Sequence, residues 1–166
     1  MNIAMGRSHA WVQRGQEYVE PRPTNWGDNL TLMGAMRASG WVTLGTCWRA
    51  MTTAAFDRWV ATHLAPRLRR GDIVLLDNLR AHKSTTARRL IEARGATIRF
   101  LPPYSYDFNP IESAWGLIKK RIRKHAPRTT AALRRTACAA RHVVRPRHCR
   151  EWFQHAGYVN STGHWG

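Results

Sequence analysis

The distribution of apolar and polar residues predicts two strands followed by a helix in the first part of the chain. Apolar side chains are dense over residues 29–36 (NLTLMGAM) and 41–48 (WVTLGTCW), and the turn-forming stretch between them indicates a strand pair. Apolar residues then recur at helical spacing from about residue 53 to residue 63, with Thr52 or Thr53 as the cap. A weaker alternation over residues 11–20 is typical of a hairpin or an extended arm.

The pattern beyond residue 70 alternates strands with longer helices. The run Ile73–Leu76 is apolar at every position, which is typical of a strand buried on both faces. A helix over residues 85–94, a strand over 97–101 and helices over 110–124 and 129–144 are predicted after it. The order β-β-α-β-α-β-α-α is that of a layered α/β domain.

Length and composition indicate one folded domain. The chain has 166 residues, of which 43% are hydrophobic, so we expect a single domain over residues 1–166 with a basic helical region at about 110–158. No apolar run approaches the roughly 20 residues that span a bilayer, and the first residues lack the apolar segment of a signal peptide. The three cysteines form no C-x-x-C pair. A cytoplasmic location in a reducing compartment is therefore expected.

The net charge of +17 is unevenly distributed along the chain. Residues 113–166 carry twelve basic side chains and one acidic side chain, whereas residues 1–60 carry six and four. A GC-rich genome would also enrich arginine, but that bias would not remove acidic residues from the last third. So large a positive charge attracts polyanions. We expect a nucleic acid rather than a membrane surface, because no segment combines strong amphipathicity with exposed Phe or Leu.

Two carboxylates occupy positions that suit metal-dependent chemistry. Asp77 follows the apolar run 73–76, where open α/β sheets place their active sites, although an Asp-Asn pair also forms a simple Asx turn. Glu112 is the third residue of a helix introduced by Asn109 and Pro110. There it either bonds back to the cap or points toward the strand ends. Ionised carboxylates bind Mg²⁺, and two such ions promote phosphodiester cleavage.

Other residues near this pair are candidate DNA contacts. His82 and Lys83 either meet phosphate or lie solvated in a loop. Tyr104 either stacks on a base or packs within its loop. A run of cations at residues 119–124 either neutralises backbone phosphates or forms an ordinary solvated helix face. The candidate DNA-binding residues are Lys83, Lys119, Lys120, Arg121, Arg123 and Lys124.

A group of cysteines and histidines near the C-terminus offers a weaker alternative. The residue types suit zinc, but their spacing does not match a zinc finger. The group consists of Cys138, His142, His148, Cys149 and His155.

Three stretches of the chain resemble the catalytic domain of DDE transposases, specifically the mariner-like bacterial insertion-sequence branch. They are GDIVLLDNLRAHKS at 71–84, IRFLPPYSYDFNPIESAWGLIKKRIR at 98–123 and EWFQHAGY at 151–158. The 34 residues between Asp77 and Glu112 match the separation of the second and third acids in that branch. Where such transposases usually have Ser-Pro-Asp, this chain has Ser105-Tyr106-Asp107, a change expected to alter loop stiffness more than chemistry.

The resemblance implies an RNase H-like fold, in which helices flank a mixed sheet. It also implies Mg²⁺-dependent DNA cleavage at the ends of a mobile element, followed by strand transfer, with Mn²⁺ as an alternative ion. Asp77 and Glu112 are the implied catalytic residues and metal ligands. The implied supporting residues of the two motifs are Asn78, His82, Asn109 and Pro110.

The first catalytic Asp of that family has no counterpart in this chain, because it precedes the segment that aligns with Met5–Arg7. The resemblance therefore predicts a catalytic domain truncated at its N-terminus, lacking the first strand of its sheet and inactive alone. The expected partners are DNA and another transposase chain, in a homodimer or a mixed dimer, at the bacterial nucleoid. A non-catalytic DNA-binding remnant that regulates a full-length transposase is the rival interpretation.

Overall fold

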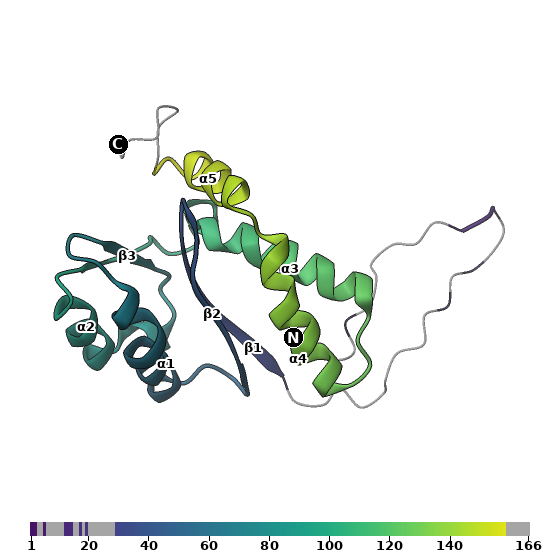
Figure 1. The fold of residues 1–166 in the computed structure, drawn as a ribbon, viewed down its shortest axis with the longest axis horizontal. Coiled ribbons are helices and arrows are strands. Elements are labelled where there is room, and N and C mark those ends of the chain that lie inside the picture. Colours follow the sequence, from purple (N-terminus) through teal and green to yellow (C-terminus); the bar gives the residue numbers. More distant parts are fainter. Residues whose placement is uncertain (3–4, 6–11, 15–16, 18, 20–28, 159–166) are drawn as a thin grey trace. The chain divides into compact units, whose positions relative to one another are not determined.

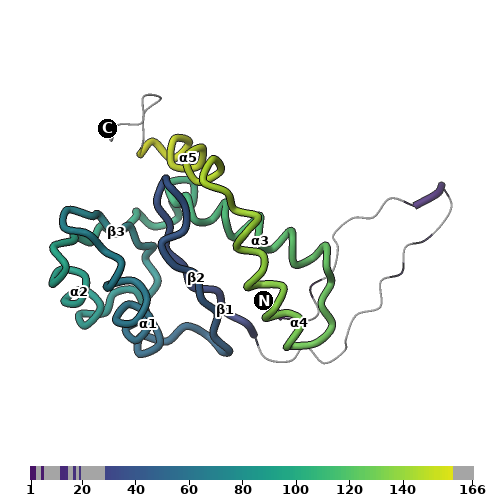
Figure 2. Tube along the Cα trace, viewed as in Figure 1, coloured from purple at the N-terminus to yellow at the C-terminus, as the bar shows by residue number. Residues whose placement is uncertain are grey.

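The first described elements form a strand pair. A computed structural model describes residues 1–2, 5, 12–14, 17, 19 and 29–158. Strand β1 (Leu30–Arg37) pairs with β2 (Gly40–Trp48) across a two-residue turn, and Figure 2 shows the two strands side by side. Gly40 has a φ of 132°, which favours glycine at this position. The predicted strand pair is confirmed, whereas the arm or hairpin predicted over residues 11–20 lies largely outside the described residues.

Helix α1 (Thr53–Trp59) begins where its cap was predicted. The Thr52 hydroxyl accepts a hydrogen bond from the Ala55 amide at 3.2 Å. The helical path continues through a wider π turn over Val60–Leu64, so the predicted helix to about residue 63 is confirmed. The face that becomes buried carries the apolar residues of the predicted pattern, Phe56, Trp59, Val60 and Leu64.

A parallel strand pair follows. Strand β3 (Ile73–Leu76) pairs with β4 (Thr97–Phe100), with Ile73 opposite Thr97. Helix α2 (Thr85–Glu92) makes the crossover that a parallel pair requires, and it contacts both β4 and α1. Figure 1 shows α1, α2 and β3 as one cluster. The α2 side chain that anchors this cluster is Ile91, which is fully buried.

The prediction that residues 73–76 are buried on both faces is wrong. The Ile73 side chain is 64% exposed, and the other three residues of β3 are only half-buried. Among the described residues β3 pairs with β4 alone, so it is an edge strand of a two-stranded sheet. Although every residue of β3 is apolar, the protein shields this strand from solvent only in part.

The remaining elements are helical. Helix α3 (Pro110–His125) and helix α4 (Thr130–Ala139) were both predicted, although α4 tightens into a 3-10 turn at Ala140–Val143. Helix α5 (Pro146–His155) was not predicted. The residues that these helices bury completely are Ala114, Ile118, Ile122, Leu133, Ala137 and Cys149. None of the described helices is long and apolar enough to cross a membrane.

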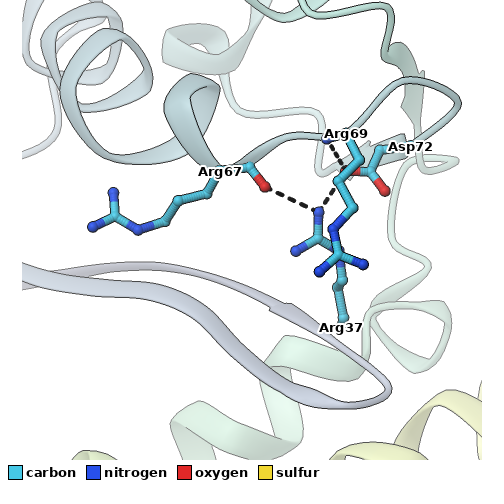
Figure 3. Close-up of polar contacts among 4 residues, drawn as sticks. All are labelled: Arg37, Arg67, Arg69 and Asp72. Carbon is cyan, nitrogen blue, oxygen red and sulfur yellow. Dashed lines mark hydrogen bonds and ion pairs between the residues drawn. The ribbon is translucent and has the colours of Figure 1, made fainter.

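An ion pair joins the end of β1 to the loop that leads into β3 (Figure 3). The Asp72 Oδ2 atom accepts from Arg37 Nη2 at 2.5 Å and from the Arg69 amide at 2.7 Å. Arg37 also donates to the Arg67 carbonyl at 3.2 Å. The Asp72 carbonyl accepts from the Thr97 amide at 2.9 Å. Asp72 therefore binds Arg37 through its side chain and the first residue of β4 through its backbone carbonyl.

The chain divides into two compact units. The first comprises Met1–Met33, Gly45–Ala50 and Trp115–Val144, and the second comprises Gly34–Leu44, Met51–Ala114 and Arg145–Gly166. The parallel strand pair, the start of α3 and both candidate carboxylates belong to the second unit.

Candidate active site

Asp77 lies directly after β3, at the carboxyl end of the parallel pair. Its Oδ1 atom accepts a hydrogen bond from the Leu79 amide at 3.1 Å and lies 2.6 Å from His82 Nδ1. The Asp77 side chain is 35% exposed. The Asx turn that the sequence offered as the alternative is therefore present. It engages only Oδ1, however, and neither contact involves Oδ2.

The surroundings of Asp77 favour its ionised form. The hydrogen bond from His82 is the largest influence and lowers the Asp77 pKa below its ordinary value of 3.8. Burial raises the pKa, but the Leu79 amide and the charge of the imidazole lower it again. The carboxylate is therefore negatively charged at neutral pH, as a metal ligand has to be.

His82 is held inside its loop instead of being solvated. It lies in a 3-10 turn, Arg80–Lys83, and its side chain is only 17% exposed. Its ring centroid is 4.5 Å from that of Phe56, a buried residue of α1. The sequence gives no signal of this contact, because 25 residues separate the two rings along the chain. His82 can thus orient the Asp77 carboxylate.

Asn78 connects the ends of the two parallel strands. Its Nδ2 atom donates to the Leu101 carbonyl, and the Leu101 amide donates to the Leu76 carbonyl at 2.8 Å. Leu101 is buried. The loop that begins at Pro102 is therefore attached to the loop that carries Asp77.

Glu112 lies in the first turn of α3, at the third helical position, where the sequence placed it. Pro110 is the first residue of the helix and is buried, and the Glu112 amide donates to the Asn109 carbonyl at 3.0 Å. The Glu112 side chain is half-buried. The first turn is where the helix dipole favours a negative side chain.

Hydrogen bonds bring Asp77 and His82 together, and they attach Asn78 to the start of the next loop. In the part of the chain that the structure describes, no three His, Cys, Asp or Glu side chains form a group that would hold a metal ion. The cysteines and histidines considered for zinc therefore do not assemble into a site. Burial raises the pKa of the fully buried Cys149, which keeps it a thiol, and His148 Nδ1 accepts from the Arg145 amide at 3.2 Å.

The candidate DNA-binding residues are exposed. Those on α3 surround the buried residues Ile118 and Ile122, so the cations occupy the outward face of an amphipathic helix. Lys83 is exposed in the 3-10 turn that also carries His82. Lys83 and the α3 cations belong to different compact units. The exposed α3 residues are Lys119, Lys120, Arg121, Arg123 and Lys124.

Comparison with known families identifies the chain. The family model of the DDE superfamily endonucleases matches residues 1–134. The chain belongs to this family. No curated protein sequence matches it significantly. The family membership agrees with the resemblance found around Asp77 and Glu112.

Solved structures with the same fold include several of the Mos1 transposase. One is the Mos1 transposase paired-end complex with left transposon end, with a TM-score of 0.72, 15% identity, and coverage of 99% of this chain and 53% of that one. Another is the Mos1 mariner paired end complex with Mn, with a TM-score of 0.67, 15% identity and coverage of 96% and 52%. A third is a pre-cleavage Mos1 transpososome, with a TM-score of 0.65, 14% identity and coverage of 100% and 54%. The chain thus spans about half the length of these relatives, and the predicted RNase H-like α/β fold is confirmed.

Proposed function

We propose that this DDE superfamily member is the catalytic part of a transposase, which cleaves DNA at the ends of a mobile element and joins the freed strand to a target. The observation that carries the proposal is the state of Asp77. It is an ionised, partly exposed carboxylate at the carboxyl end of a parallel strand, oriented by His82. Open α/β sheets place their chemistry at this end.

A divalent metal ion, Mg²⁺ with Mn²⁺ as an alternative, is the expected cofactor. Asp77 and Glu112 offer carboxylate oxygens, which are the ligands that these ions prefer. Asp77 fits this role because His82 and the Leu79 amide hold Oδ1, so that the carboxylate is both charged and oriented. When bound, the ion would help to activate the attacking oxygen and to stabilise the leaving oxygen.

The other residues of the site would position the reacting groups. His82 orients Asp77, and Asn78 keeps the loop before α3 attached to the end of β3. The exposed cations of α3 would hold the DNA backbone by neutralising phosphates. DNA is accordingly the expected substrate. A second transposase chain, identical or full-length, is the expected protein partner.

Nicking of supercoiled plasmid in the presence of Mg²⁺ or Mn²⁺ tests this proposal. The resemblance predicts that the chain lacks the first catalytic Asp, so the question is whether metal-dependent nicking remains. Nicking that requires the metal, and that Asp77→Ala and Glu112→Ala each abolish, would support the catalytic proposal. Glu92→Ala is the matched control, because Glu92 is an exposed acid on α2 whose contact is with Arg88 on the same helix. Loss of nicking in the control, or nicking that persists in Asp77→Ala, would contradict the proposal.

The exposed cationic face of α3 favours a second candidate, a non-catalytic DNA-binding regulator. This face lies in a different compact unit from Asp77, so a regulator that binds DNA through it would not need the carboxylates. A regulator would bind DNA in a salt-sensitive manner. It would nick no plasmid, and Asp77→Ala would leave its affinity unchanged.

A further inference from the structure

The loop between β4 and α3 exposes an unusual number of aromatic side chains. We call residues 102–109 (PPYSYDFN) the aromatic loop. Within it Tyr104 is 93% exposed, Tyr106 is 67% exposed and Phe108 is 52% exposed. Large apolar groups gathered at one surface site commonly mark a binding surface. The packed loop tyrosine that the sequence offered as the alternative for Tyr104 is therefore wrong.

The backbone of this loop is anchored although its rings are exposed. At one end Leu101 is buried and its carbonyl accepts from Asn78, and at the other end Pro110 is buried. Within the loop the Phe108 carbonyl accepts from the Tyr158 hydroxyl at 2.8 Å. An anchored loop loses little conformational freedom when a partner binds its rings, which favours affinity.

The conformation of Tyr104 itself points to a function. Its φ is +61°, in the left-handed region that bulky residues seldom adopt. Such strain persists where the surroundings impose it, and it is concentrated at functional sites. Here it accompanies a ring that is almost completely in solvent, so packing of the ring does not account for it.

The loop lies beside the candidate carboxylates. It starts at the carboxyl end of β4, the parallel neighbour of the strand that ends before Asp77, and it is followed at once by the helix that carries Glu112. The carboxyl ends of parallel strands meet at one edge of a sheet. The loop that carries the rings thus starts at the sheet edge where Asp77 lies and ends where the helix of Glu112 begins.

We propose that the aromatic loop is a stacking surface for unpaired DNA bases, with Tyr104 as the principal contact. Aromatic rings stack on any base without reading sequence, but only bases outside the duplex present a free face. The loop contains one acid, Asp107, and no cation, so it would hold bases and not phosphates. The phosphates would be met elsewhere on a chain of net charge +17. The choice of DNA rests on the proposed function.

Binding to two DNA duplexes separates this contact from general DNA affinity. One duplex is blunt and the other is the same duplex with a single-stranded 3′ overhang. Tyr104→Ala should weaken binding to the overhang duplex by roughly 5- to 150-fold while leaving the blunt duplex unchanged. Tyr104→Phe should retain wild-type affinity, because it keeps the ring. The slope of log affinity against log salt should be the same in all variants, because each variant keeps every cation that neutralises a phosphate.

Ile73→Ala is the matched control, since Ile73 is another exposed apolar side chain, 64% exposed, at the opposite end of β3. It should not discriminate between the duplexes. The inference would be overturned if Tyr104→Ala bound each duplex as tightly as the wild type does. It would also be overturned if Tyr104→Ala lost the same factor in affinity on both duplexes. If either of these results is obtained while the wild type still nicks plasmid, the stacking proposal fails and the catalytic proposal stands. If Tyr104→Ala selectively loses the overhang duplex but the wild type never nicks plasmid, the catalytic proposal fails and the stacking surface stands.

Discussion

His82→Ala is the most informative single perturbation, because His82 both orients Asp77 and packs against the core. The hydrogen bond to a charged carboxylate would contribute about 1.5–3 kcal/mol if both groups were buried. Asp77 is 35% exposed, so solvent screening lowers this to about 1 kcal/mol. Removal of the ring that packs on Phe56 adds about 0.5–1.5 kcal/mol. We therefore expect His82→Ala to lower the free energy of unfolding by about 1.5–2.5 kcal/mol.

A double-mutant cycle with Asp77→Asn measures the His82–Asp77 contribution separately. Urea unfolding of the wild type, both single variants and the double variant should give a coupling free energy of about 1 kcal/mol, with the remainder belonging to the Phe56 contact. A coupling near zero at neutral pH would refute the argument that His82 orients Asp77 through a stabilising hydrogen bond.

The same pair predicts the pH dependence of stability. The Asp77 pKa is lowered in the folded protein, mainly by the His82 hydrogen bond. Its contribution to stability is therefore fully present above the ordinary carboxyl pKa of 3.8 and is lost as the pH falls through the lower folded value. The free energies of unfolding of the wild type and Asp77→Asn should therefore become equal as the pH falls through this acidic range. A difference that stays constant across the range would contradict the assignment of this pH dependence to Asp77.

Three further variants test other parts of the structure. Asp72→Asn removes the ionic component of the hydrogen bond from Arg37. Because both side chains are partly exposed, it should lower the free energy of unfolding by about 1 kcal/mol without changing DNA affinity. An unchanged urea midpoint would contradict this expectation. Ile91→Ala leaves a cavity at a fully buried position of α2 and should lower the free energy of unfolding by about 2–5 kcal/mol in urea. A decrease as small as that of a surface substitution would show that α2 is not packed as described. The double variant Lys119→Gln, Lys120→Gln should weaken binding to all DNA sequences. It should also reduce the slope of log affinity against log salt by about 0.9 for each phosphate that is no longer neutralised. An unchanged slope would contradict the proposed role of α3 in DNA binding.

The positions of the elements were largely predictable, because they depend on local patterns. The helical spacing that begins at Phe56 and the cap at Thr52 are properties of short segments, and both are confirmed. Helix α5 was missed because Pro146 suggested an end rather than a start, although proline is favoured in the first helical turn. The apolar run of β3 predicted a strand correctly but overstated its burial, since burial depends on which other strands and helices cover it.

The sequence by itself determined the chemistry available to this protein: an acid after an apolar strand, a second acid in the first turn of a helix, and a polycationic helix after it. Chemical identity and short-range spacing are written directly in the order of residues. Only the tertiary structure decided that His82 bonds to Asp77 and packs on Phe56, that Asn78 ties the ends of β3 and β4, and that Tyr104 is exposed. These relations join residues from separate elements, and whether a side chain is exposed depends on everything that packs around it.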